Sequence, residues 1–600
     1  MQDEQDTQEG AGLPEAQETD AAGTTASAPD AGDTPSVIRA TADPEGVPAT
    51  ERPAGVRRVV VLADAVPPAM LRALLEPYRG SELFVVAPEP HAEWGLDGLH
   101  ERFLPFGKES NAQWYLKLWG PVDVIVNARS APASRHDAML ADLFFHLHPG
   151  GTYVVPRWAL TAYRPGNPLE VRLRRLAAAL VRGVPDDASK RDRELAEAVS
   201  AVDVTRDEIR LVKRGRHYLK LSDRWADRML GTRDRDLVVR RLRTLPAQTF
   251  ASGTRLVSHG ASRELAGLAT TVEVPPLHLR SYRGQVGLVS NSLAFTRHEI
   301  LPDSFRHHLA ADLVNPRVVD VNKDFARIPQ HVMPTEELPG SYYLLDAENS
   351  GHFGHLMTEV ISRLWGWDAA KADDPDLRAI FRIRHANERD PRLERMLLTA
   401  FGIAEHDITW IDHPVYVESL YAATPMFHNS RPHYVHPQIR ETWRRIRAGL
   451  PADPGPTWDK VFVSRPDTFG NRRCLNRPEV ERHFADAGFH VIYPEQHSLS
   501  RQAEIFSAAR VVAGFAGSAL FNTLFAERLE HLVVLGQEAY TARNEVLISL
   551  PLDVQVDYFW NEPEIAHPPG GWSREAYKSD WTFDLRRHRK DLARLLREVR

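Results

Sequence analysis

The stretch from Val461 to Phe525 reads VFVSRPDTFGNRRCLNRPEVERHFADAGFHVIYPEQHSLSRQAEIFSAARVVAGFAGSALFNTLF. Short apolar runs that predict buried strands alternate in it with segments of helical periodicity. The predicted strands are 461–463, 489–493, 511–513 and, just beyond, 532–535; the predicted helices are 478–487, 499–509 and 518–526. This alternation predicts β-α-β crossovers and a parallel sheet, which binds ligands beyond the carboxyl ends of its strands.

Two features follow the predicted strands at that edge. Arg465 stands after the first strand, and Arg472 and Arg473 lie in the loop beyond it; a guanidinium there would donate two parallel hydrogen bonds to a phosphate. The loop from Gly514 to Asn522, GFAGSALFN, has glycines that let a backbone approach a phosphate, and Ser518 is a candidate N-cap. The alternatives are solvated surface arginines and an ordinary tight turn.

An upstream segment carries residues suited to proton transfer. His355 and Glu359 enter an apolar-periodic helix one turn apart on one face, and His352 stands at its entrance. An imidazole can take a proton from an attacking hydroxyl, while a carboxylate one turn away orients the ring. A zinc site and histidines buried inside a crevice are the alternatives. The order of these residues is not the His-Glu-x-x-His of helical metalloproteases, and no cysteine lies nearby.

These motifs resemble, in order and spacing, glycosyltransferase family 61. The resemblance spans roughly residues 272–557. Its elements are His352, His355 and Glu359, then Ser464-Arg465, Arg473 with Asn476, Tyr493-Pro494-Glu495 with Gln502, and Gly514 through Phe525. Many family members have His-Gly in the glycine loop where this chain has Ala516-Gly517, so a role for that histidine does not transfer.

The family resemblance implies an α/β fold with two facing Rossmann-like domains, of the kind called GT-B. The donor nucleotide sugar would bind the C-terminal domain and a glycan or lipid-linked acceptor the N-terminal one. The implied reaction is an inverting sugar transfer that needs no metal and no cofactor, in bacterial capsular polysaccharide biosynthesis. His355 is the expected base, Glu359 orients it, and His352 is the fallback.

The expected donor-binding residues lie in the C-terminal domain. Most follow a predicted strand or line the glycine loop. They are Arg465, Arg473, Asn476, Glu495, Gln502, Gly514, Gly517, Ser518 and Asn522.

The domain division follows from composition. We expect a disordered acidic tail over 1–55, a Rossmann-like accessory domain over 56–160, a charged helical connector over 161–265, an acceptor-side domain over 266–450, a donor domain over 451–560 and a basic amphipathic helix within 561–600. The tail is poor in large apolar side chains and carries twelve acidic and two basic residues up to Pro53. The remainder is close to neutral, which gives no reason to expect nucleic-acid binding.

The compartment is predicted from what the sequence lacks. A single cysteine, Cys474, excludes internal disulfides and suits a reducing compartment. No apolar run is long enough to span a bilayer, and no secretory signal precedes the domains, so we expect a cytoplasmic protein. The C-terminal helix either packs on the core or makes a peripheral contact with the inner membrane. The sequence does not predict an oligomeric state.

The segment 56–160 is again α/β. Predicted strands at 59–63, 83–87, 122–127 and 151–155 alternate with helices at 68–78 and 136–148. Part of it, 122–153, resembles a Rossmann-type methyltransferase, but the first strand ends in Asp64-Ala65-Val66-Pro67-Pro68 without the glycine of a cofactor loop. We therefore expect an accessory domain. Two alternatives for the whole chain are a non-catalytic scaffold and an S-adenosylmethionine-dependent methyltransferase.

Overall fold

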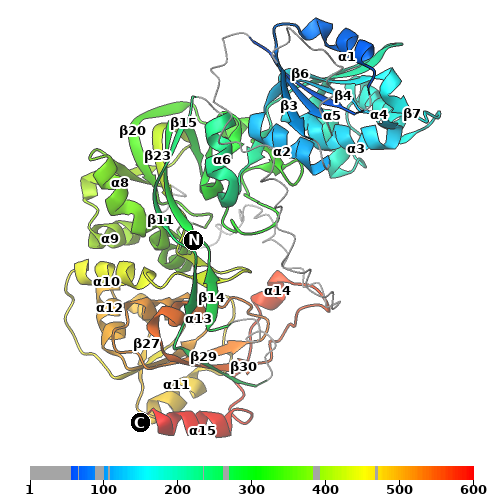
Figure 1. The fold of residues 1–600 in the computed structure, drawn as a ribbon. Coiled ribbons are helices and arrows are strands. Elements are labelled where there is room, and N and C mark those ends of the chain that lie inside the picture. Colours follow the sequence, from blue (N-terminus) through cyan, green and yellow to red (C-terminus); the bar gives the residue numbers. More distant parts are fainter. Residues whose placement is uncertain are drawn as a thin grey trace, which may run out of the picture.

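The structure is a computed structural model that describes residues 56–64, 66–87, 101–105, 109–233, 236–260, 269–349, 351–382, 392–466 and 470–599. The predicted acidic tail therefore lies outside the described residues. The fold is a mixed α/β arrangement with three large sheets. In Figure 1 the first sheet (blue and cyan) lies at one end of the molecule, the second (green) in the middle and the third (orange and red) at the other end.

The first sheet has seven strands in the order β3-β2-β1-β4-β6-β9-β8. The first five are parallel, and β9 is antiparallel to both of its neighbours. The strands are β1 (Arg58–Ala63), β2 (Glu82–Ala87), β3 (Glu101–Pro105), β4 (Val122–Ala128), β6 (Leu147–Pro156), β8 (Val199–Val204) and β9 (Glu208–Lys213). The helices are α1 (Pro68–Leu75), α2 (Glu109–Trp119), α3 (Ala133–Leu143), α4 (Pro168–Arg182) and α5 (Lys190–Ala198).

The segment 161–265, expected as a helical connector, contributes strands to all three large sheets. It contains α4, α5 and α6 (Asp223–Arg233), but β8 and β9 complete the first sheet. β10 (Tyr218–Lys220) and β11 (Val238–Leu245) join the second sheet, and β13 (Arg255–His259) joins the third. β11 is mostly exposed and rich in arginine, so it lacks the apolar alternation from which a strand is predicted.

The second sheet has eleven strands and mixes both strand directions. Its parallel part has the order β23-β20-β21-β22; β15 pairs antiparallel with β23, and β11 pairs antiparallel with β15. The principal strands are β15 (Leu277–Val289), β20 (Glu336–Leu344), β21 (Arg378–Arg382), β22 (Ile408–Ile411) and β23 (Val415–Ala423). The shorter ones are β16 (Leu293–Phe295), β17 (Glu299–Ile300), β18 (Val319–Asp320) and β19 (Phe325–Arg327).

A long helical segment follows β20 and carries the predicted histidines. It runs through α7 (Phe353–His355), the π-helical turn η10 (Leu356–Val360), the 3-10 segment η11 (Ile361–Gly366) and α8 (Trp367–Asp373). Helices α9 (Arg392–Phe401) and α10 (Ile439–Gly449) pack next to each other behind it. A π-helical turn is uncommon and often marks a functional site, because it changes which side chains share a face.

The third sheet is wholly parallel, with the order β13-β30-β29-β28-β26-β27. The four strands predicted from the sequence are confirmed as β26 (Lys460–Val463), β27 (His490–Ile492), β28 (Val511–Phe515) and β29 (His531–Gln537), joined by β30 (Gln555–Asn561). Its helices are α11 (Arg477–Asp486), α12 (Leu499–Ala508), the 3-10 helix η14 (Ser518–Phe525), α13 (Asn544–Ser549) and α14 (Arg574–Tyr577). The order of connection reverses between β26 and β28, where such sheets bind ligands.

The C-terminal helix α15 (Arg589–Glu598) packs its apolar side on the third sheet. Leu592, Leu595 and the following Val599 are each 1 % exposed and share a core with Phe462 of β26 and Phe484 of α11. These side chains are therefore not available to a bilayer. Of the two interpretations of this helix, the structure supports packing on the core.

Candidate functional site

The histidine and glutamate predicted on one helical face form a direct pair. His355 Nδ1 lies 2.7 Å from Glu359 Oε1, across the π-helical turn. An ionised carboxylate only accepts hydrogen bonds, so Nδ1 carries the hydrogen and Nε2 keeps its lone pair. Glu359 is buried, and His355 remains partly exposed. The pair is arranged as a base whose tautomer is fixed by a buried carboxylate.

Arg306 holds Glu359 in the ionised form. Its Nε donates to Glu359 Oε1 over 3.0 Å. Burial alone would raise the pKa of Glu359, but the charges of Arg306 and His355 and their hydrogen bonds hold that pKa well below its usual value. Glu359 therefore stays an acceptor at neutral pH.

His352 has the opposite tautomer. Its Nδ1 accepts the N–H of Gly354 over 3.2 Å, so the neutral ring carries its hydrogen on Nε2. Its ring centre lies 5.1 Å from that of His355. Burial lowers the pKa of His352 to about 4, and the neighbouring His355 and Arg472 lower it too. The neutral His352 ring therefore carries a hydrogen-bond donor at Nε2.

Two arginines converge on the glycine loop at the switch point of the third sheet. A side-chain carbon at Gly517 would lie 3.4 Å from Arg465 Nη1 and 3.6 Å from Arg472 Nη2. Burial and the charge of Arg472 together lower the pKa of Arg465 to about 10. The Arg472 guanidinium lies over the Tyr540 ring, 4.2 Å from its centre. Two adjacent cations beside a glycine backbone favour an anionic ligand.

Arg473 and Asn476, which were expected at the donor site, lie elsewhere. Arg473 donates through its backbone N–H and two guanidinium nitrogens to Asp580. The side chain of Asn476 bonds both backbone groups of Phe583. Both residues tie the start of α11 to the C-terminal segment. Arg472 takes the place that the prediction gave to Arg473, because the backbone at Arg472 has the left-handed φ of 53°.

Of the remaining predicted donor residues, Glu495 lies near Arg465, and Gln502, Asn522 and Gly514 stabilise the surrounding fold. Glu495 is exposed and acts on Arg465 through its charge. Gln502 and Asn522 bond each other over 2.8 Å and brace η14 against the loop after β27. A side chain at Gly514 would come within 2.6 Å of the Val463 carbonyl oxygen, so this glycine permits strand packing.

Ser518 does not cap the following helix. Gly517 occupies the cap position, and no side chain bonds the first turn of η14. Instead the N–H of Gly517 donates to Glu545 Oε1 over 2.7 Å. Ala516, which stands where many relatives have histidine, is 8 % exposed and contacts Gly536 within the core.

The histidine helix and the glycine loop are in contact. A side-chain carbon at Gly354 would lie 3.1 Å from Ser518 Cβ and 3.0 Å from the Phe521 ring. The charges of Arg472 and Arg465 act directly on His352. The structure therefore brings the His355–Glu359 pair of the second sheet next to Arg465 and Arg472 of the third.

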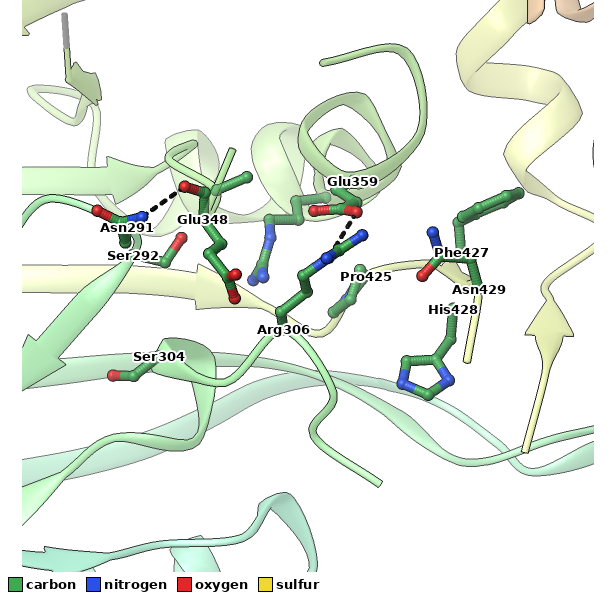
Figure 2. Close-up of a pocket in the computed structure, with 12 residues that line it drawn as sticks. Asn291, Ser292, Ser304, Arg306, Glu348, Glu359, Pro425, Phe427, His428 and Asn429 are labelled. Carbon is green, nitrogen blue, oxygen red and sulfur yellow. Dashed lines mark hydrogen bonds and ion pairs between the residues drawn. The ribbon is translucent and has the colours of Figure 1, made fainter. Parts of the chain in front are cut away.

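A polar pocket lies beside Glu359, on the side of the second sheet (Figure 2). Its walls come from segments that follow β15, η8 (Pro302–Ser304), β20 and β23, with Arg306 bonded to Glu359 across it. Most of the lining is polar, and Pro425 and Phe427 give an apolar wall. The lining residues are Asn291, Ser292, Ser304, Arg306, Ala347, Glu348, Glu359, Arg363, Pro425, Phe427, His428 and Asn429.

Comparison with protein families decides the class of this site. Residues 353–533 match the family model described as Glycosyltransferase 61. This segment belongs to glycosyltransferase family 61. The segment is accordingly a glycosyltransferase domain, and the resemblance drawn from the sequence is confirmed for it. The matched segment contains both His355 and Arg465.

Other comparisons add little about the glycosyltransferase. The comparison with curated proteins gave no match. Among solved structures, the methyltransferase MycE from the mycinamycin biosynthetic pathway aligns with 26 % of the chain at 20 % identity, with TM-scores of 0.20 and 0.22 in two crystal forms. The chain spans 41 % and 45 % of those MycE chains. The antibiotic-resistance methyltransferase Kmr aligns with 27 % of this chain and 89 % of its own, at 14 % identity and a TM-score of 0.18.

Within the described ranges, no helix of the glycosyltransferase combines the length and apolar character needed to cross a bilayer. Nor do the described side chains include three or more His, Cys, Asp or Glu grouped so as to hold a metal ion.

Three residues of the site were missed or passed over at the sequence level. Arg306 lies outside every recognised motif, and Glu545 follows the glycine loop by 28 residues. The donor site was predicted with Arg473, whereas the structure places Arg472 beside Gly517. The signal that could have separated the arginines is their partner: only Arg473 is paired with an aspartate, Asp580, which is distant in sequence.

Proposed function

We propose that the chain is an inverting glycosyltransferase that moves a sugar from a nucleotide donor to a glycan, free or lipid-linked, without a metal ion. The observation that carries the proposal is the convergence of Arg465 and Arg472 on Gly517, next to the His355–Glu359 pair. Two guanidinium groups can balance the charge of a nucleoside diphosphate, as a divalent cation does in other enzymes.

The proposed reaction is a direct displacement at the anomeric carbon. His355 Nε2 takes the proton of the acceptor hydroxyl, and the oxygen forms a bond to that carbon as the bond to the diphosphate breaks. The attack comes from the face opposite the leaving group, so the configuration inverts. Glu359 stabilises the imidazolium that forms, and the leaving diphosphate is held by Arg465 and Arg472, with the Nε2–H of His352 nearby.

The pocket beside Glu359 is the proposed acceptor site. Its position at the carboxyl ends of β20 and β23 is where an α/β sheet binds ligands. Its mixture of amide, hydroxyl, carboxylate and guanidinium groups with one aromatic wall is of the kind that contacts a sugar, and its present open space of about 20 Å³ would have to widen to admit one. In this proposal the second and third sheets are the facing halves of a GT-B enzyme of polysaccharide synthesis.

Donor binding tests the proposal. Calorimetry with UDP-, GDP-, CMP- and dTDP-sugars in EDTA should give saturable binding of one donor, which Arg465→Ala weakens about 10- to 100-fold, the loss of one charge-assisted contact. Arg473→Ala is the matched control, because Arg473 is occupied by Asp580, and should bind like wild type. No donor binding, or equal losses in both variants, would contradict the proposal and favour a non-catalytic scaffold.

A further inference from the structure

Glu545 is a buried acidic residue that has no role in the proposed sugar transfer. It is the second residue of α13, is 0 % exposed, and accepts the N–H of Gly517 at Oε1 over 2.7 Å. Its other oxygen, Oε2, is buried and has no hydrogen-bond partner among the described residues. The buried carboxylate is thus bonded to the glycine loop through Oε1, while Oε2 lacks a hydrogen bond.

The groups around Glu545 come from every neighbouring element. Arg472 precedes α11, Arg543 precedes α13, and both act on Glu545 through their charges. Tyr540 after β29 and Tyr558 of β30 are in turn influenced by the Glu545 charge, and Tyr577 of α14 influences both tyrosines. On the side of β25 (Tyr434–Val435), the titratable neighbour is His433, which is close to Arg543.

Gly517 separates Glu545 from the arginine pair. The N–H of Gly517 points to the carboxylate, whereas its α-carbon faces Arg465 Nη1 and Arg472 Nη2. Only Gly517 would then separate a diphosphate held by those guanidinium groups from the Glu545 carboxylate. Two neighbouring negative charges disfavour each other's ionised form.

We propose that Glu545 is a positioning residue for the nucleoside diphosphate and takes up one proton when the diphosphate binds. This inference rests on the proposed function, because it requires a diphosphate at Gly517. Without a ligand, the carboxylate balances the Arg472 charge and fixes the loop. With a ligand, a proton from solvent is taken up on Oε2, which removes the negative charge, while Oε1 still accepts the Gly517 N–H.

The direction of the pH effect follows from this exchange. Burial raises the pKa of Glu545 to about 7 in the free protein, against the lowering effects of Gly517, Arg543 and Arg472. Above that pH the free enzyme is ionised and the complex is protonated, so binding consumes a proton. Affinity for the diphosphate should therefore fall as pH rises above about 7, approaching tenfold per pH unit.

Calorimetry of nucleoside diphosphates tests the inference. UDP, GDP, ADP and dTDP are titrated with EDTA at pH 8 in two buffers of different ionisation enthalpy, and the slope gives the protons taken up. The wild type should take up most of one proton more than Glu545→Gln, whose amide still accepts the Gly517 N–H. The affinity of Glu545→Gln should change little between pH 6.5 and 8.5.

A matched control is Glu538→Gln. Burial also raises the pKa of Glu538 at the same end of β29, but this residue pairs with Arg587 instead of the glycine loop. It should take up protons like wild type. Binding with equal proton numbers in wild type and Glu545→Gln overturns this inference alone, whereas no diphosphate binding overturns the proposed function as well. If Glu545→Gln fails to fold, a wild type that binds without proton uptake still decides against it.

Discussion

The first and third sheets share a parallel arrangement but differ at the edge where ligands bind. In the first sheet the order reverses between β1 and β4, and there Asp64 Oδ1 accepts the N–H of Ser130 over 2.8 Å, with Arg129 3.7 Å from the same carboxylate. In the third sheet the order reverses between β26 and β28, and there two arginines face a glycine. At the first edge a carboxylate bonds a backbone N–H and lies beside one arginine, whereas the third edge carries two neighbouring arginines, which we propose to hold a ligand.

This difference indicates that the parallel sheet determines where a ligand can bind, while the side chains after its strands determine which ligand. Both edges lie at a topological switch point, where crevices form. The residues after the strands differ in chemistry: Asp64 bonds the Ser130 N–H at the first sheet, whereas Arg465 and Gly517 at the third sheet are the groups that we propose to meet an anion. We therefore expect donor chemistry in the C-terminal half alone, with the first sheet as a support.

The largest effect should come from the base. His355→Asn keeps a hydrogen-bond donor next to Glu359 and removes the basic Nε2, so turnover of the donor should fall about 10²- to 10⁴-fold with unchanged donor affinity. Release of nucleoside diphosphate measures turnover, and calorimetry measures affinity.

The control lies on the first sheet's side. His136 of α3 bonds the Arg129 carbonyl through Nε2, and His136→Gln keeps a donor at that point. It should leave turnover unchanged. A loss of turnover in His136→Gln comparable to that in His355→Asn would show that the first sheet takes part in the reaction, which contradicts the proposed difference between the two sheets.

The next effect separates the two edges directly. Arg472→Ala should weaken donor binding about 10- to 100-fold, because one charge-assisted contact to the diphosphate is lost. Arg129→Ala removes an arginine from the equivalent edge of the first sheet and should leave donor affinity unchanged. Both variants are compared by calorimetry at one ionic strength. Equal losses would show that the first sheet, too, contributes to donor binding.

The sequence predicted the third sheet well and the site only in part. Strands β26 to β29 were predictable because each is a short apolar run bounded by loop residues, and Arg465 and Gly517 follow such runs directly. His355 and Glu359 were predictable from helical spacing, although the turn between them is π-helical. These features depend on residues that are close in sequence.

The remaining features depend on partners that are distant in sequence. The choice between Arg472 and Arg473 depends on a left-handed backbone at one and on Asp580 at the other. Arg306 reaches Glu359 from 53 residues upstream. The antiparallel strands β11 and β15 of the second sheet pair across Leu245 and Leu277, and a register shift interrupts the pairing near Arg243. Local periodicity contains none of this information.

The smallest effect should come from Asp64 at the edge of the first sheet. Asp64→Ala removes the acceptor for the Ser130 N–H at a solvent-exposed position, and should lower the free energy of unfolding by about 0.5–1 kcal/mol. Asp64→Asn keeps an acceptor oxygen and should stay close to wild type in urea unfolding. Neither variant should change donor affinity or turnover, since the carboxylate bonds only its own sheet edge. A fall in turnover at unchanged stability would mean that this edge takes part in the reaction, and the contrast between the two sheets would then be one of degree.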